Sequence, residues 1–269
     1  MNSHINHNGE IRRHDDAYIS PNNRGFSFGD GFFESCLFEN GLCKLWKFHK
    51  ERIKKALNTL GLNLELDIEL LYKEVERVID TKSIERVKII FYRKGAGAYT
   101  PLTSDCGYLI SANTLEKPLI EKQKLNCDFA NEIYVYSSSL GIKTLSSLNY
   151  VRAAIEKKER GLDDLILVNE KEEITEATAS NIWWVKDEII YTPSEASGGV
   201  SGVYKQFLTS VLKQEGIVCQ PGQFKKNDLL DADEVFLTNA IQGIKPVIQV
   251  ADVFFKTQIV HYLVDKVSY

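Results

Sequence analysis

One lysine stands in an otherwise uncharged run near the middle of the chain. Lys143 follows residues 140–142 (Leu-Gly-Ile) and precedes residues 144–147 (Thr-Leu-Ser-Ser). Burial among apolar groups disfavours the charged form of an amine, and a neutral amine is a nucleophile that forms Schiff bases with carbonyl compounds. A surface lysine whose stem lies along apolar residues would leave the same pattern. Lys143 is therefore a candidate catalytic residue, with the surface alternative open.

A glutamate in a run of small residues is the second feature. Glu176 lies in the segment Thr-Glu-Ala-Thr-Ala-Ser-Asn, residues 175–181, which we expect to be a turn between strands at 165–168 and 182–185. A carboxylate is what the protonated ring nitrogen of pyridoxal phosphate needs as a partner. Lys143 and Glu176 together suggest chemistry with that cofactor, although the pair alone does not establish it.

The composition is that of a soluble globular protein. The 269 residues are 43% hydrophobic and 26% charged, which allows one large or two modest domains. The net charge is −4 with acidic and basic residues interleaved, so we expect no nucleic-acid surface. Apolar runs are too short to span a membrane, and the N-terminus lacks the apolar core of a signal peptide. We expect a cytoplasmic protein that does not bind membranes.

The cysteines and histidines point the same way. The chain has five cysteines, an odd number, without a C-x-x-C pair, and this pattern favours free thiols in a reducing compartment. The five histidines lack the spacing of zinc ligands. We expect no metal. The cysteines are Cys36, Cys43, Cys106, Cys127 and Cys219.

The hydrophobic periodicity predicts helices alternating with strands in two domains. A charged stretch that contains Pro118 separates a domain at residues 1–114 from one at 125–269, with a linker at 115–124. We expect a hairpin within residues 1–20, helices at 45–60, 67–79 and 148–160, a helix that residues 198–205 open and Gly216 closes, a short helix from 227, and a C-terminal helix. Further strands are expected at 33–37, 87–93, 108–112, 189–191 and 234–238.

A glycine-rich segment lies before the first long helix. Residues 24–34 read R-G-F-S-F-G-D-G-F-F-E, and Gly25, Ser27 and Gly29 match the nucleophile-elbow pattern of serine hydrolases. That pattern needs a buried strand before it and a helix after it. Here Pro-Asn-Asn precedes and another glycine turn follows, so we reject the hydrolase reading.

Taken together, the glycine segment, the lysine run K-T-L-S-S-L at 143–148 and the Glu176 segment resemble the class IV aminotransferase family. These are pyridoxal-phosphate enzymes of fold type IV, and they include branched-chain and D-amino-acid aminotransferases and 4-amino-4-deoxychorismate lyases. The resemblance extends over nearly the whole chain. It implies an α+β fold like that of D-amino-acid aminotransferase, with a small N-terminal and a larger C-terminal domain, the cofactor between them, and a homodimer.

The resemblance also implies roles for individual residues. Lys143 would carry the cofactor and exchange protons with a small amino substrate, and Glu176 would face the ring nitrogen. His49 and Arg52 match an H-x-x-R element whose arginine binds the cofactor phosphate, which suits the fork of a guanidinium. A solvated helix charge is the alternative for Arg52. His49 would orient this segment.

Residues 198–205 resemble a G-x-x-x-G-I-x-R element that holds the phosphate through backbone amides. Lys205 replaces its arginine. A glycine-preceded helix N-terminus suits an anion. The remaining cofactor-binding residues that the resemblance implies are Ala179, Val200, Val203, Tyr204, Ala240 and Ile241.

The substrate side is matched less completely. The lysine run and the Asn239-Ala240 loop are similar to the lyase branch, which releases pyruvate to give 4-aminobenzoate for folate synthesis. Tyr108 stands near the place of an arginine in that branch, so recognition of the substrate carboxylate stays open. An aminotransferase for branched-chain or D-amino acids and a catalytically silent binding homologue are the alternatives. Candidate substrate neighbours are Phe28, Arg93, Tyr99 and Asn239.

Overall fold

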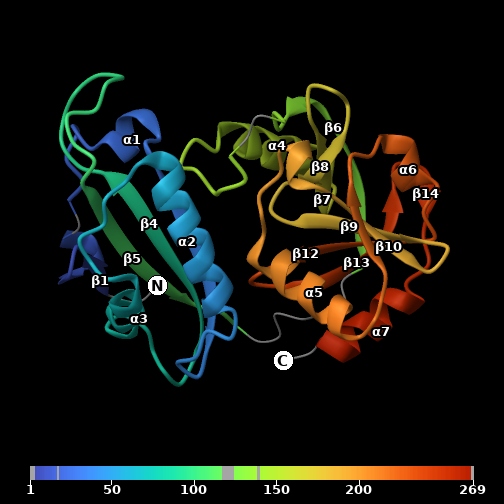
Figure 1. Cartoon of the computed structure of the whole chain (residues 1–269), viewed down its shortest axis with the longest axis horizontal. Coiled ribbons are helices and arrows are strands. Elements are labelled where there is room, and N and C mark those ends of the chain that lie inside the picture. The colour runs from blue at the N-terminus through green and yellow to red at the C-terminus, as the bar shows by residue number, and fades with distance from the viewer. Residues whose placement is uncertain (1–3, 17, 117–123, 138–139, 268–269) are drawn as a thin grey trace. The chain divides into compact units, whose positions relative to one another are not determined.

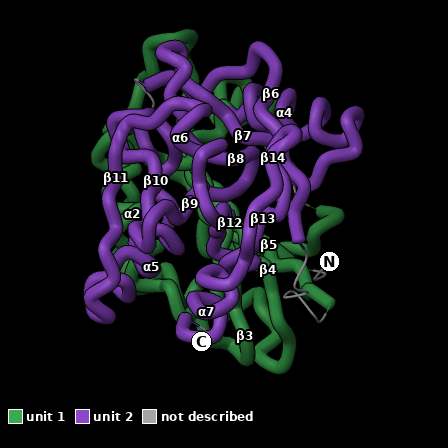
Figure 2. The backbone as a smooth tube through the Cα atoms, turned by 90° about the vertical axis from the view of Figure 1, so that its right-hand side faces the viewer, with its two compact units in different colours: residues 1–119, 142–146 green, residues 120–141, 147–269 purple. Residues whose placement is uncertain are grey.

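The chain divides into two compact units. The computed structural model describes residues 4–16, 18–116, 124–137 and 140–267. Unit 1 comprises residues 1–119 and 142–146, and unit 2 comprises residues 120–141 and 147–269 (Figure 2). The predicted linker, residues 115–124, lies mostly outside the described residues, so the domain boundary stays a prediction. The contacts group residues 142–146, and with them Lys143, with unit 1.

Unit 1 contains an antiparallel sheet of five strands in the order β2-β1-β5-β4-β3. The predicted hairpin is present, because Asn8 and Gly9 both adopt the positive φ that a tight hairpin turn requires. In β4, every second residue from Glu85 to Phe91 is buried, whereas six of the nine residues of β3 are buried without strict alternation. The strands are β1 (His4–His7), β2 (Glu10–Arg13), β3 (Gly31–Glu39), β4 (Ile84–Arg93) and β5 (Cys106–Thr114).

Helices cover this sheet. The helix α2 (Trp46–Leu60) buries Ile53 and Ala56 and ends at Gly61, whose left-handed conformation closes the last turn. The helix α3 (Ile68–Glu76) begins after Asp67, whose carboxylate accepts from the Glu69 amide at 3.0 Å. Figure 1 shows α2 lying over one face of the sheet. The short elements η1 (His14–Asp16) and α1 (Arg24–Phe28) complete the unit.

Unit 2 is built on a larger mixed sheet in the order β11-β10-β9-β12-β13-β6-β7-β8, with β14 beside β13. Strands β7 and β9 are buried on both faces, which suits their near-continuous apolar sequence. The strands are β6 (Leu125–Tyr134), β7 (Asp164–Val168), β8 (Ile174–Ala177), β9 (Asn181–Lys186), β10 (Ile189–Pro193), β11 (Cys219–Gly222), β12 (Glu234–Asn239), β13 (Gly243–Val250) and β14 (Val253–Phe254).

Two helices of unit 2 end just before a glycine, as the sequence predicts. Gly161 and Gly216, just beyond two of the helices, have positive φ. Trp183 and Trp184 of β9 are both buried in the core. The helices are α4 (Leu148–Glu159), η2 (Glu195–Ser197), α5 (Val203–Gln214), α6 (Lys226–Leu230) and α7 (Gln258–Val267).

Three local predictions were wrong. Glu176 lies in strand β8, opposite Leu167 of β7, and not in a turn. All four residues of β8 are buried, so the strand lacks the alternation that would reveal it. The helix α3 ends at Glu76, so Val78 and Ile79 lie beyond it. Strand β13 includes residues 243–247, which we expected to continue the loop that begins at Asn239.

Two findings concern membrane spans and cysteines. Within the described residues, no helix has the length and apolar character needed to cross a membrane. All five cysteines are free thiols, and four of them are buried.

Candidate active site

Lys143 lies on a short extended segment that pairs with the start of β3. Its carbonyl oxygen accepts from the Phe33 amide at 2.8 Å, and the Leu145 amide donates to the Gly31 oxygen at 3.0 Å. Gly29 has φ +65°, and a Cβ there would lie 2.4 Å from Ser146 Oγ. Glycine at this position therefore lets the lysine segment approach the backbone.

Two amines share one aromatic ring in unit 1. The Nζ atoms of Lys143 and Lys88 each lie 5.0 Å from the centre of the Phe33 ring. A ring face attracts cations. Burial lowers the pKa of Lys88, and the charge of Arg86 adds to this effect. Lys143 is partly exposed.

Arg52 is buried in an ion-paired cluster. Its Nε and Nη2 donate to the two oxygens of Glu34 at 2.7 and 2.6 Å, and His49 Nδ1 lies 2.6 Å from Glu34 Oε2. Arg52 is 5% exposed, so it is not a solvated helix charge. Its two-pronged contact fixes the guanidinium plane. The structure does not test its predicted contact with a phosphate, which stays a prediction.

The charge state of this cluster follows from its geometry. Burial alone would raise the pKa of Glu34, but the Arg52 charge and the hydrogen bonds from His49 and Arg52 outweigh it and hold that pKa at about 2. Burial lowers the pKa of His49, against the opposing effect of Glu34. The charge of Lys143 lowers the His49 pKa further, so Lys143 lies within electrostatic reach of the cluster.

In unit 2, Glu176 is a buried carboxylate that is held at both oxygens. The Tyr150 hydroxyl donates to Oε1 at 2.5 Å, and the Val200 amide donates to Oε2 at 3.1 Å. Burial and the negative charge of Glu176 raise the pKa of Tyr150 far above its usual range, so the phenol keeps its proton and stays a donor. The arrangement suits a fixed, ionised carboxylate.

The N-terminus of α5 offers backbone amides to an anion. Val203 and Tyr204 are its first two residues, and Gly202 precedes them without a side-chain cap. Amides of a first helical turn have no partner within the helix and bind anions well. Asn181 Nδ2, at the start of β9, donates to the Val200 oxygen at 2.8 Å. This hydrogen bond connects the segment that leads into α5 with β9. Such amides can hold a phosphate.

The loop of the predicted cofactor-binding residues Ala240 and Ile241 is held by the Asn239 side chain. Its Oδ1 accepts from the amides of Ile241 and Gln242 at 3.0 and 2.8 Å, and its Nδ2 donates to Ser180 Oγ at 3.0 Å. Ser180 follows Ala179 in the turn between β8 and β9. Asn239 thus connects the turn of the predicted residue Ala179 with the loop of Ala240 and Ile241.

The predicted substrate neighbours in unit 1 have different environments. The Phe28 and Tyr99 rings lie 5.9 Å apart, and Tyr99 is 91% exposed. Arg93 is buried, with Nε 3.1 Å from Asp30 Oδ2 and Nη1 and Nη2 donating to the carbonyls of Gly61 and Leu60. These contacts tie β4 to the end of α2. The substrate roles of Phe28, Tyr99 and Arg93 stay predictions.

Lys205 is a largely buried lysine in the first turn of α5. Its Nζ donates to the Pro193 carbonyl and lies 5.8 Å from the centre of the Trp183 ring. Burial lowers the pKa of Lys205 to about 8, although the charges of Glu176, Cys219 and Glu195 act in the opposite direction. The lysine that replaces the family's arginine thus has a pKa only slightly above neutral pH.

Sequence reasoning missed two partners of the predicted residues. Glu34 was part of the quoted glycine segment, but nothing in its spacing pairs it with Arg52 and His49. Tyr150 carries no local signal, because its partner Glu176 belongs to a different element. Both partners become visible only when the fold brings distant segments together.

Comparison with known proteins gives relatives of similar length. An aminodeoxychorismate lyase of Vibrio harveyi is 26% identical over 247 residues, which cover 86% of this chain and 87% of the relative. One from Bacillus subtilis is 27% identical over 273 residues, covering 93% and 88%. A D-alanine aminotransferase of Listeria monocytogenes is 26% identical over 257 residues, covering 91% and 88%.

Solved structures and a family profile agree on the fold. A branched-chain aminotransferase from Thermoproteus uzoniensis superposes with a TM-score of 0.90 at 20% identity, covering 98% of this chain and 92% of that one. A 4-amino-4-deoxychorismate lyase from Pseudomonas aeruginosa gives 0.82 at 24% identity, covering 94% and 97%. These likenesses confirm the predicted fold class. The profile of the family described as amino-transferase class IV matches residues 31–250.

Proposed function

This chain belongs to the class IV amino-transferase family, and from this premise we propose that it is a pyridoxal-phosphate enzyme acting as a 4-amino-4-deoxychorismate lyase. The reaction releases pyruvate and leaves 4-aminobenzoate, a precursor in folate synthesis. The observation that carries the proposal is the environment of two residues at the family's positions. Lys143 is a partly exposed amine, and Glu176 is a buried carboxylate with a donor at each oxygen.

The side chains present suit the cofactor. The amine of Lys143 would hold pyridoxal phosphate covalently, and Glu176 would pair with its ring nitrogen. The cofactor supplies an electron sink for bond cleavage next to the substrate nitrogen. Arg52 and the first amides of α5 would hold the phosphate group.

The chain's own groups would do the remaining work. The Nζ atom of Lys143 would take up and return the substrate proton. Tyr150 and the Val200 amide would keep Glu176 oriented and ionised. His49 and Glu34 would fix the guanidinium of Arg52. Each role is one of binding, orienting or moving a proton.

The preference for the lyase rests on sequence. The run K-T-L-S-S-L at 143–148 and the Asn239-Ala240 loop are similar to the lyase branch, and two of the relatives are aminodeoxychorismate lyases. An aminotransferase is the second candidate, because a D-alanine aminotransferase matches at the same level of identity. We further propose that the enzyme is a cytoplasmic homodimer, which fits the family pattern and the five free thiols.

Absorption spectroscopy separates the candidates. We expect a visible band from the lysine-bound cofactor that survives L-glutamate, D-alanine and L-leucine, together with pyruvate formation from 4-amino-4-deoxychorismate without any added keto acid. Bleaching of the band by one donor would indicate an aminotransferase and identify its donor class. Absence of the band after reconstitution with pyridoxal phosphate would instead support a silent homologue.

Two lysine variants test the assignment of the attachment site. Lys143→Ala should lose both the visible band and turnover. Lys88→Ala is the matched control, because its Nζ lies at the same distance from the Phe33 ring, and it should keep the visible band. Turnover in Lys143→Ala, or loss of the band in Lys88→Ala alone, would contradict the proposal. Gel filtration of the wild type tests the homodimer.

A further inference from the structure

Three potential metal ligands meet inside unit 1. Cys36 lies on β3, Cys43 follows the turn after β3, and His49 lies in the first turn of α2. One ligand atom from each lies within 4.8 Å of the others. The exposed fractions are 0% for Cys36 and His49 and 8% for Cys43. The expectation of no metal considered only histidine spacing and did not cover this group.

One nitrogen of His49 has no protein partner. His49 Nδ1 lies 2.6 Å from Glu34 Oε2, and Glu34 is ionised because it is paired with Arg52. A carboxylate only accepts, so Nδ1 carries the proton and Nε2 presents a lone pair. Nε2 is buried and has no hydrogen-bond partner among the described residues. Metal-binding histidines typically donate their second nitrogen to a carboxylate in this way.

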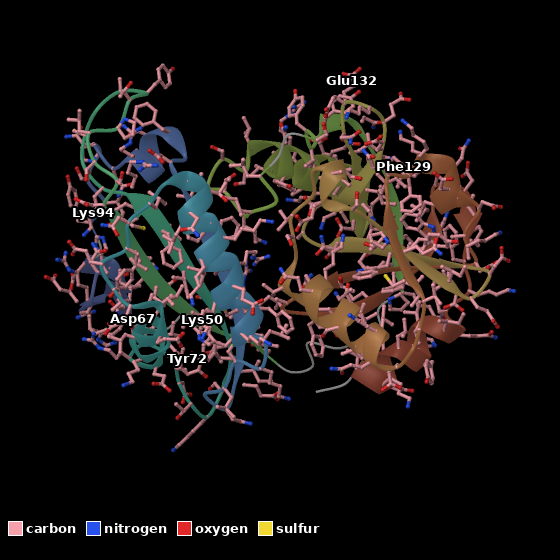
Figure 3. All side chains as sticks on the ribbon, in the orientation of Figure 1. Lys50, Asp67, Tyr72, Lys94, Phe129 and Glu132 are labelled. Atoms are coloured by element: carbon pink, nitrogen blue, oxygen red, sulfur yellow. The ribbon has the colours of Figure 1, made fainter. Side chains whose placement is uncertain are left out.

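The turn that carries Cys43 is held in place. The Tyr72 hydroxyl, on α3, accepts from the Cys43 amide and donates to the Gly41 carbonyl, both at 3.2 Å. Its ring lies 5.5 Å from that of Phe38 and 5.0 Å from that of Trp46. Figure 3 labels Tyr72 among the side chains of unit 1. The thiol therefore sits on a fixed backbone rather than on a loose loop.

We propose that Cys36, Cys43 and His49 bind a zinc ion. Two thiolates and a neutral imidazole neutralise a dication, and sulfur and nitrogen ligands select zinc over magnesium or calcium. Zinc–sulfur bonds of about 2.3 Å place two tetrahedral sulfurs about 3.8 Å apart. The ligand atoms now lie within 4.8 Å of one another. The side chains must therefore move by about an ångström to reach tetrahedral distances around the ion.

The binding step balances without any redox change. Each thiol loses its proton to the buffer as its sulfur bonds to the ion, so two protons leave for each ion bound. Three protein ligands leave a fourth position, which a water molecule fills. The ion would thus connect β3, the following turn and the start of α2.

Cobalt(II) is a coloured probe for such a site. Tag-free, full-length protein is reduced with a phosphine, stripped of metal and titrated with cobalt(II), and spectra are read as differences against the metal-free protein. We expect thiolate-to-cobalt charge-transfer absorption and strong visible bands of a tetrahedral ion, saturating at one ion per chain and abolished by zinc. Absence of charge-transfer absorption in the reduced wild type would overturn the proposal.

Cysteine variants locate the ion. Cys36→Ser and Cys43→Ser should each lose the charge-transfer absorption, whereas Cys106→Ser and Cys127→Ser are controls because these buried thiols lie outside the group and should retain it. Retention in both Cys36→Ser and Cys43→Ser would refute the assignment. If these two variants fail to fold, proton release decides. Release of two protons per zinc by the wild type supports the site, and release of none refutes it.

Discussion

The Tyr150 hydroxyl donates a hydrogen bond of 2.5 Å to Glu176 Oε1, across the space between α4 and β8. Glu176 is buried, and its other oxygen accepts from the Val200 amide. The carboxylate is thus held by a phenol that cannot ionise beside it, because burial and the Glu176 charge keep the pKa of Tyr150 high. Under the proposed function, this contact orients the partner of the cofactor ring.

Tyr150→Phe should weaken pyridoxal-phosphate binding. The variant removes one hydrogen bond to a charged group, worth about 1.5–3 kcal/mol, so we expect the dissociation constant to rise by about 10- to 100-fold. Reconstitution titrations of the cofactor-free protein, followed by visible absorption, measure this constant. Tyr262→Phe is the control, because that tyrosine is 49% exposed on α7, and it should bind normally.

A double-mutant cycle tests whether Tyr150 acts through Glu176. If it does, Tyr150→Phe should add little to the effect of Glu176→Gln on the dissociation constant. Independent effects that simply add would show that Tyr150 acts on the cofactor by another route, and the orienting role would have to be abandoned.

Glu34→Gln should destabilise the protein strongly. Removal of one partner from a buried ion pair leaves the Arg52 charge without compensation, which costs about 3–5 kcal/mol. Urea unfolding at neutral pH measures this loss. Glu69→Gln is the control, because its contact with Lys50 is exposed at the surface, and such pairs contribute about 0–1 kcal/mol. Equal losses in the two variants would contradict the structural role of Glu34.

The same pair predicts an acid dependence. The pKa of Glu34 falls from 4.5 to about 2 in the folded chain, so the folded state binds fewer protons than the unfolded state in between. Ionised Glu34 therefore contributes its full stabilisation of the fold above the pKa of the unfolded state. This stabilisation is lost as the pH falls through the pKa of the folded state. The stability difference between wild type and Glu34→Gln should stay constant above pH 4.5 and shrink below it.

Gly198→Ala should disturb the approach to α5. Gly198 has φ +99°, and a Cβ there would lie 2.2 Å from the Tyr136 carbonyl oxygen. The loop would have to move, and with it the Val200 amide that contacts Glu176. We expect lower thermal stability and weaker cofactor binding. Gly216→Ala is matched, because φ is +70° with no atom within 4 Å, so only the backbone strain of about 1 kcal/mol remains.

Sequence patterns predicted those elements whose apolar faces alternate with polar ones. The helix α2 shows this, since Ile53 and Ala56 share a buried face and Gly61 ends it. Strand β8 was missed because it is buried throughout, and β13 because Gly243 and Pro246 resemble loop residues, although Pro246 pairs with Phe236. Local spacing is uninformative where both faces are covered.

The candidate site divides in the same way. Lys143 and Glu176 stand out because family motifs surround them, and the family itself is confirmed. The partners that hold these residues, such as Tyr150, lie on other elements, and only tertiary packing brings them together. The Cys36, Cys43 and His49 group escaped notice because its members come from a strand, a turn and a helix.

Lys205 should make the protein gain stability in alkaline solution. Burial lowers its folded pKa from 10.5 to about 8, so between these values the unfolded chain binds more protons than the folded one, and stability rises with pH. Relative to Lys205→Met, which cannot titrate, the wild type should gain on the order of 2 kcal/mol across this window in urea titrations. Lys186 provides the contrast, because its hydrogen bond to Asp231 raises its pKa, and its contribution should fall as the pH rises. If the stability difference between the wild type and Lys205→Met stays flat across this pH window, Lys205 does not titrate there in the folded chain. The assignment of Lys205 in α5 as a buried lysine with a lowered pKa would then have to be abandoned.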